Sequence, residues 1–278
     1  MYAERPDFIR MWDEQMAHAF EQKRLAGEGS ESFWDNPVNV DRYVRRLQND
    51  DRGRIHYQLS SMAIQKGSSV LDIGAGPGTL AVPLALSGCS VTTVEPSSFM
   101  GKGMEAYRVL TNAPQIREIR KTWEAAAPEE IGTYDYVVAS RSLMMGNIRD
   151  CMLKMDAAAN IAVHLFWFLI PPSLSRGNVD LWPLLHDEPY KYEPTADILW
   201  NVLYQLGIYA NLTVESSNVG QVFADLNEMR QDYYTRMIAR TDEQKEIVNT
   251  YLDEHVVRTE RGYIFPGKSI TAHIWWEK

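Results

Sequence analysis

The sequence has few cysteines, a deficit of basic residues and no long apolar run. Its two cysteines, Cys89 and Cys151, are too few for a disulfide framework and lack the spacing of metal ligands. The 28 Lys and Arg residues are outnumbered by 37 Asp and Glu residues and are not clustered, which excludes a site for nucleic-acid phosphates. The longest apolar run, residues 161–170, is half of the roughly 20 residues that a membrane helix needs. We therefore expect no metal site, no nucleic-acid partner and no membrane span.

The N-terminal segment indicates where the protein is located, and the length of the chain limits the number of domains. Residues 1–15 are charged throughout and lack the apolar core of a signal peptide, so we expect a cytoplasmic protein. A chain of 278 residues fits one principal core with a helical appendage. We expect an N-terminal helical cap over residues 1–50 and an α/β domain over residues 51–278.

The hydrophobic pattern changes near residue 68. Before it, Phe8, Met11, Trp12 and Met16 recur at helical spacing, so we predict helices. After it, strand-like runs alternate with helical or turn-rich segments, and a helical insertion at about 222–257 precedes the last strand. The predicted strands are 69–73, 90–95, 115–121, 134–140, 160–168, 209–217 and 269–277. This order predicts an α/β fold with a Rossmann-like, seven-stranded, mostly parallel sheet and helices on both faces.

The stretch "VLDIGAGPGTL", residues 70–80, predicts a ligand-binding turn between a strand and a helix. Gly74, Gly76 and Gly78 follow the strand at a spacing of two, where the backbone can approach a ligand closely. The spacing differs from the G-x-G-x-x-G fingerprint of dinucleotide-binding proteins, and the loop has no lysine for a phosphate. Asp72 places a carboxylate at the strand end, which favours a ligand with a positive charge.

A second carboxylate lies at the end of the next predicted strand. Glu95 follows the glycine turn by about twenty residues, where a carboxylate can accept hydrogen bonds from both hydroxyls of a ribose. The two spacings together predict a site for a positively charged, ribose-containing cofactor.

These segments resemble a known family. "VLDIGAGPGTLAVPLA", followed by "VTTVEPS" and by "GTYDYVVASRSL", is similar to the motifs of the class I S-adenosylmethionine-dependent methyltransferases, over roughly residues 55–170. The resemblance implies S-adenosylmethionine as the cofactor. It implies that the backbone of Gly74, Ala75 and Gly76 contacts the methionine part, with Asp72 in support and with Gly78 in the same turn.

The resemblance implies further contacts with the cofactor. Glu95 would hold the ribose and Pro96 would line the adenine pocket, while Ser140 would lie near the methionine part and the transferred methyl group. Where the family often has an acidic residue and then a packing residue for adenine, this sequence has Thr122 and Trp123. Thr122 departs from that pattern, and Trp123 offers a flat face for stacking on adenine.

The sequence does not identify the acceptor or a general base. We expect a methyltransferase that acts on a small organic molecule, because the motifs of amide or adenine nitrogen methylation and of pyrimidine carbon methylation are not found after the fourth strand. Two alternatives stay open. One is a regulatory protein that binds S-adenosylmethionine without catalysis, and the other is a NAD(P)-dependent oxidoreductase, which the glycine spacing and Asp72 disfavour.

Overall fold

The computed structural model describes residues 6–27, 34, 36–50, 52–170, 173–217 and 222–278, and it centres on a seven-stranded sheet. The strand order is β3-β2-β1-β4-β5-β10-β6, and β10 runs in the direction opposite to the other six strands. The strands are β1 (Ser69–Ile73), β2 (Ser90–Val94), β3 (Arg117–Ile119), β4 (Tyr134–Ser140), β5 (Ala159–Ile170), β6 (Asn211–Ser217) and β10 (Ser269–Glu277). The predicted α/β fold with a mostly parallel sheet of seven strands is confirmed.

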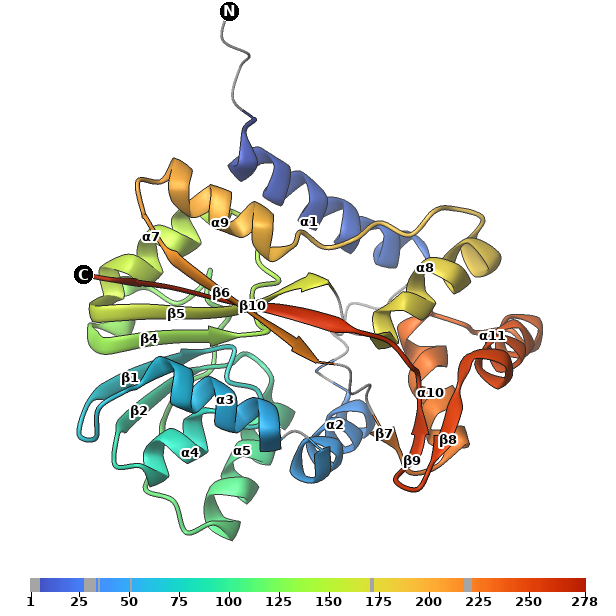
Figure 1. Ribbon diagram of the computed structural model, residues 1–278, viewed down its shortest axis with the longest axis horizontal. Coiled ribbons are helices and arrows are strands. Elements are labelled where there is room, and N and C mark those ends of the chain that lie inside the picture. The colour runs from blue at the N-terminus through green and yellow to red at the C-terminus, as the bar shows by residue number, and fades with distance from the viewer. Residues whose placement is uncertain (1–5, 28–33, 35, 51, 171–172, 218–221) are drawn as a thin grey trace, which may run out of the picture.

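Helices cover both faces of the sheet (Figure 1). One face packs against α1, α7 and α9, and the other packs against α3, α4 and α5, so each face has its own hydrophobic cluster. The bounds are α1 (Phe8–Leu25), α2 (Pro37–Asp50), α3 (Arg52–Met62), α4 (Ala81–Leu86), α5 (Ser98–Leu110), α6 (Pro128–Ile131), α7 (Ile148–Ala158) and α9 (Ala196–Gln205). The central strand β4 has mostly buried residues, as expected for a parallel strand covered on both sides.

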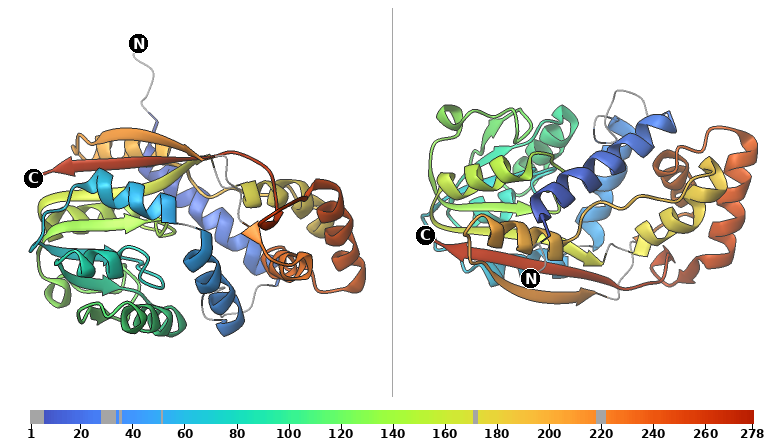
Figure 2. Two further views of the ribbon diagram at one scale, coloured as in Figure 1. Left: turned by 60° about the horizontal axis from the view of Figure 1, so that its bottom comes forward. Right: turned by 90° about the horizontal axis from the view of Figure 1, so that it is seen from above.

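Helix α1 runs from beside the sheet to the segment that precedes α9 (Figure 2). Its first turn lies beside the C-terminal end of α9, where the Gln205 side chain accepts a hydrogen bond from the Phe8 amide at 2.9 Å. Its last turns hold the segment before α9, because the Gln22 side chain accepts from the Lys191 amide at 2.8 Å. Residues 1–5 and 28–33 of the expected cap lie outside the described residues.

A second, smaller unit lies beside the edge at which the parallel strands end (Figures 1 and 2). It contains α8 (Ser173–His186), α10 (Leu226–Arg236), α11 (Asp242–His255) and a sheet of β7 (Val222–Phe223), β9 (Gly262–Ile264) and β8 (Val257–Thr259). Trp182, Phe223, Tyr233, Leu252 and Phe265 belong to its separate hydrophobic cluster. We call this unit the edge unit. The helical stretch predicted at about 222–257 is thus two helices and a short strand, and it shares a core with α8 and with residues beyond it.

Among the described residues, no helix is long and apolar enough to cross a membrane. Nor does that part of the chain bring three or more His, Cys, Asp or Glu side chains together in a way that could hold a metal ion.

Candidate functional site

The glycine turn connects β1 to α4 at the edge of the sheet where the parallel strands end. Gly74 and Gly76 have φ values of +66° and +54°, a region that favours glycine. A Cβ on Gly74 would lie 2.3 Å from the Cβ of Ser142, so the turn packs tightly against the loop after β4. A Cβ on Gly76 would meet no atom within 4 Å. The backbone at Gly76 therefore borders open space that a ligand can enter.

The other residues of the turn are packed inward. Ala75 is buried, and a Cβ on Gly78 would lie 2.6 Å from the side chain of Met104 in α5. Gly78 thus lies closely against α5, while the Gly76 backbone borders open space.

Glu95 links the glycine turn to the end of β2. Its carboxylate accepts a hydrogen bond from the Gly76 amide and another from the Ser97 amide, each at 2.9 Å. Pro96, which lies between Glu95 and Ser97 in the sequence, is exposed. The Glu95 carboxylate is thus an acceptor group that lies beside the open backbone of Gly76.

Asp72 lies beneath the same turn and is nearly inaccessible. Its side chain is 2% exposed and accepts a hydrogen bond from the amide of Ala81, at the start of α4. Burial, with a smaller contribution from the negative charge of Glu95, raises the pKa of Asp72 from 3.8 to about 7. A positively charged ligand group at the turn would favour the ionised carboxylate and lower this pKa.

Ser140 ends β4, and a buried glutamine holds it. The Gln58 side chain in α3 is 1% exposed and donates from Nε2 to the Ser140 hydroxyl at 3.0 Å. Arg54, one turn earlier, donates to the Gln58 carbonyl oxygen at 3.0 Å. The sequence analysis did not identify Gln58. The available signal was a polar residue between Ile55, Leu59 and Met62 on the apolar stripe of a helix.

The loop between β4 and α7 connects the glycine turn to α1. The Ser142 hydroxyl donates to the carbonyl of Ile73 at 2.6 Å. At the other end of the loop, the indole of Trp12 donates to the carbonyl of Met145 at 3.0 Å. The carboxylate of Asp13 accepts from the amide of Ile148 at 3.0 Å, and so caps the first turn of α7. Two adjacent residues of α1 therefore fix the loop that borders the site.

Thr122 and Trp123, which the family motif predicts near adenine, differ in their exposure to solvent. Thr122 is exposed, and its hydroxyl accepts from the Ala125 amide at 3.3 Å. Trp123 is 3% exposed, and its indole donates to the Cys151 carbonyl at 3.1 Å. The ammonium of Lys154 lies 4.3 Å from the centre of the same ring. The Trp123 ring is thus part of the core beside α7, and this arrangement does not expose a face of the ring for adenine.

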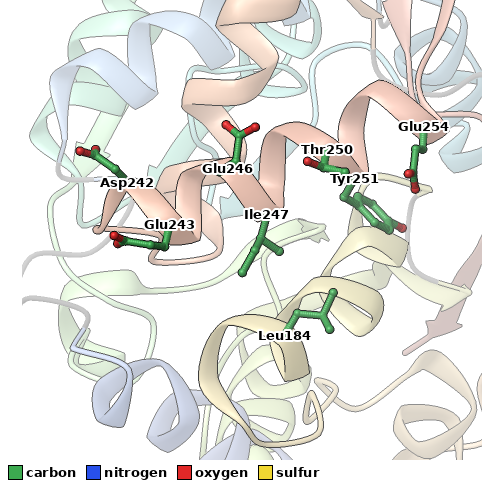
Figure 3. A pocket seen from close by; sticks show the side chains of 8 residues that line it. All are labelled: Leu184, Asp242, Glu243, Glu246, Ile247, Thr250, Tyr251 and Glu254. Carbon is green, nitrogen blue, oxygen red and sulfur yellow. The ribbon is translucent and has the colours of Figure 1, made fainter.

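A cavity of about 710 Å³ lies elsewhere, between α8 and α11 (Figure 3). Four carboxylates and four other side chains line it, namely Asp242, Glu243, Glu246, Glu254, Leu184, Ile247, Thr250 and Tyr251. All of them belong to the edge unit. The cavity therefore contains none of the predicted cofactor residues.

The site brings an open backbone turn, two carboxylates and a serine together at one edge of the sheet. Glu95 bonds the turn directly and raises the pKa of Asp72 through its charge, while Ser142 joins the turn to the loop that follows Ser140. A cofactor with both a cationic group and a ribose fits this donor and acceptor set. A diphosphate does not, because two carboxylates would repel it.

Comparisons with known proteins identify a family model, related sequences and a similar fold. Residues 43–159 match the family model described as "Methyltransferase domain". An uncharacterized protein of Haemophilus influenzae is 29% identical over 222 residues, 78% of this chain and 79% of that protein. Ubiquinone biosynthesis O-methyltransferase of Vibrio parahaemolyticus is 36% identical over 93 residues, which are 32% of this chain and 38% of that enzyme. Coclaurine N-methyltransferase, solved with N-methylheliamine and SAH, has the same fold at 14% identity and a TM-score of 0.56, with 96% of this chain and 89% of that chain covered.

Proposed function

We propose that this chain, which belongs to the class I S-adenosylmethionine-dependent methyltransferases, transfers the methyl group of that cofactor to a small organic molecule. The observation that carries the cofactor half of this proposal is the pair of carboxylates at the Gly76 turn. The acceptor half rests on the edge unit, which lies across the same end of the sheet.

We propose that Glu95 binds the ribose and that Asp72 supports the positively charged methionine part. The two oxygens of the Glu95 carboxylate are the kind of acceptor that two ribose hydroxyls require, and they lie beside the open backbone of Gly76. The buried Asp72 carboxylate gains most from a nearby cation, because burial and Glu95 disfavour its ionised form. The backbone of Gly74, Ala75 and Gly76 would approach the cofactor, and Gly78 would hold the turn in place.

Pro96 and Ser140 complete the proposed cofactor site, and Thr122 stays at its rim as an exposed hydroxyl. The contact of Trp123 with adenine stays a prediction from the family motif, since the ring belongs to the core. When bound, S-adenosylmethionine supplies an electrophilic methyl group. The chain has to bind it, align the acceptor and exclude water.

A small acceptor agrees with the arrangement of the edge unit and with the charge of the chain. The unit has its own hydrophobic core and lies beside the strand ends, so an acceptor has to reach the cofactor past it. The net charge of −9 disfavours nucleic acid as the acceptor.

The cofactor half is tested by calorimetric titration of the full chain with S-adenosylmethionine. We expect Glu95→Gln to weaken binding by roughly tenfold or more, because each hydrogen bond to a charged group contributes about 1.5–3 kcal/mol. The matched control is Asp156→Asn, a carboxylate remote from the turn that accepts from the Trp276 indole at 2.7 Å. Equal losses in both variants, or no binding by the wild type, would contradict the assignment.

The acceptor half is tested by a transfer assay. The chain is incubated with isotopically labelled cofactor and with fractions of small metabolites, and we expect label in a low-mass product. Cofactor binding with no transfer to any fraction would favour the non-catalytic alternative.

A further inference from the structure

The two edges of the main sheet differ in length and in charge. The edge strand β3 has three residues, and Arg117 and Glu118 lie in it, followed by Arg120 and Lys121. Short length and charge are devices that prevent an edge strand from pairing with another chain. At the opposite edge, β6 has seven residues with the sequence "NLTVESS" and includes no lysine, arginine or proline. Strand β6 is therefore the longer edge, and Glu215 is its one charged residue.

Apolar side chains are exposed along β6. Leu212 and Val214 are 37% and 55% exposed. They lie opposite Ile274 and Ala272 of β10, which are buried on the face of the sheet that α9 covers. The exposed pair therefore lies beside α9.

Three aromatic side chains continue this surface. Trp200, Tyr204 and Tyr209 are 36%, 47% and 78% exposed. The rings of Trp200 and Tyr204 lie 6.3 Å apart and those of Tyr204 and Tyr209 lie 5.8 Å apart. The Trp200 indole donates to the carbonyl of Ala210 at 2.9 Å, which ties α9 to the residue before β6. We call Trp200, Tyr204, Tyr209, Leu212 and Val214 the β6 patch.

We infer that the β6 patch is the interface of a homodimer, in which β6 pairs antiparallel with β6 of a second copy about a twofold axis. This inference is independent of the proposed function. The axis would be perpendicular to the sheet, so both copies would present α9 on the same face and the two patches would meet. Tyr and Trp side chains are the residues that contribute most at such interfaces.

The area of the patch agrees with a dimer. With aromatic side chains of 150–250 Å², the exposed parts of the patch come to roughly 400 Å² per copy. Two copies, together with the backbone of the paired strands, would bury about 1,000 Å², the lower limit for a specific interface. We therefore expect a dimer that dissociates on dilution.

The inference is tested by light scattering coupled to size-exclusion chromatography on the full chain, over a range of concentrations. We expect the wild type to approach twice the chain mass of 31.8 kDa as the concentration rises. Val214→Lys puts a charge on the paired edge, and we expect it to stay monomeric. The matched control is Leu110→Lys, because Leu110 is 76% exposed at the end of α5 and lies outside the patch. We expect this control to dimerise as the wild type does.

A second variant separates loss of the interface from loss of folding. Tyr209→Glu changes a side chain that is 78% exposed in a loop, so the fold is retained, and we expect a weaker dimer with an unchanged circular dichroism spectrum. A wild type that is monomeric at every concentration, a higher oligomer, or a dimer that Val214→Lys and Tyr209→Glu leave unchanged would each overturn the inference. Equal dissociation by Leu110→Lys would also overturn it.

Discussion

Asp72→Asn should stabilise the empty protein and weaken cofactor binding at the same time. The asparagine keeps the shape of the side chain and can still accept the hydrogen bond from the Ala81 amide. It removes the charge, which burial and Glu95 disfavour. A residue that lowers stability in the absence of its ligand is typical of a functional site.

The magnitude follows from the shift in the pKa of Asp72. A rise from 3.8 to about 7 means that the ionised carboxylate lowers the free energy of unfolding by about 4 kcal/mol. Because the folded state binds this proton more tightly, the stability that Asp72 contributes is complete below pH 3.8 and is lost as the pH rises through about 7. We therefore expect Asp72→Asn to raise the melting temperature of the empty protein most clearly above pH 7.

Cofactor affinity should show the opposite dependence on pH. The cation needs the ionised form of Asp72, so the affinity of the wild type should rise about tenfold from about pH 6 to about pH 8. The affinity of Asp72→Asn should be lower at the upper pH and nearly constant over this range. His164 and His273 do not interfere, because burial lowers their pKa values to about 3 and about 4.

Two measurements decide the matter. Thermal unfolding of both proteins without cofactor gives the effect on stability, and calorimetric titration with S-adenosylmethionine across the pH range gives the effect on binding. The reasoning is refuted if Asp72→Asn is less stable than the wild type at every pH, or if wild-type affinity does not change with pH.

Three further predictions concern the turn, the sheet and α1. Gly74→Ala should destabilise the protein by about 1–3 kcal/mol in urea unfolding, because φ is +66° and the new Cβ would lie 2.3 Å from Ser142; an unchanged midpoint would contradict this. The stability that His164 and His273 contribute should be complete above pH 6.5 and should be lost as the pH drops towards 4, because their ring nitrogens lie 3.0 Å apart in a buried site and both rings take up protons on unfolding. The measurement uses Asp72→Asn, which removes the opposite pH dependence of Asp72, and equal urea midpoints at neutral and mildly acidic pH would count against it. Asp13→Ala should lower kcat more than it weakens cofactor binding, because it removes a helix cap worth about 1 kcal/mol that positions the loop after β4. Equal losses of kcat in steady-state kinetics and of affinity in calorimetry would exclude this positioning role.

Features that depend on short stretches of sequence were predictable. The sheet follows from alternating strands and helices, and the turn follows from glycines within a few residues of one strand. The contact between Gly76 and Glu95 spans 19 positions, and the regular spacing of two strands and a helix determines it.

Features that depend on distant segments were not predictable from the pattern. Gln58 meets Ser140 across 82 positions, and Trp12 meets Met145 across 133, with no periodicity that relates the two partners. The position of Trp123 depends on the carbonyl of Cys151 in α7, which the order of residues near Trp123 does not show. The edge unit has a core shared between residues on both sides of α9 and β6, so one continuous insertion was too simple a division.

The place of β10 has a consequence for synthesis of the chain. This strand follows β5 and β6 in the chain, yet it lies between them and pairs with both. Until the ribosome has released the residues of β10, β6 has no neighbouring strand in the main sheet, and the edge of β5 that pairs with β10 has no hydrogen-bonded partner strand. The nascent protein therefore has to keep an incomplete sheet from aggregating until β10 has been made, and removal of β10 would detach β6 from the sheet.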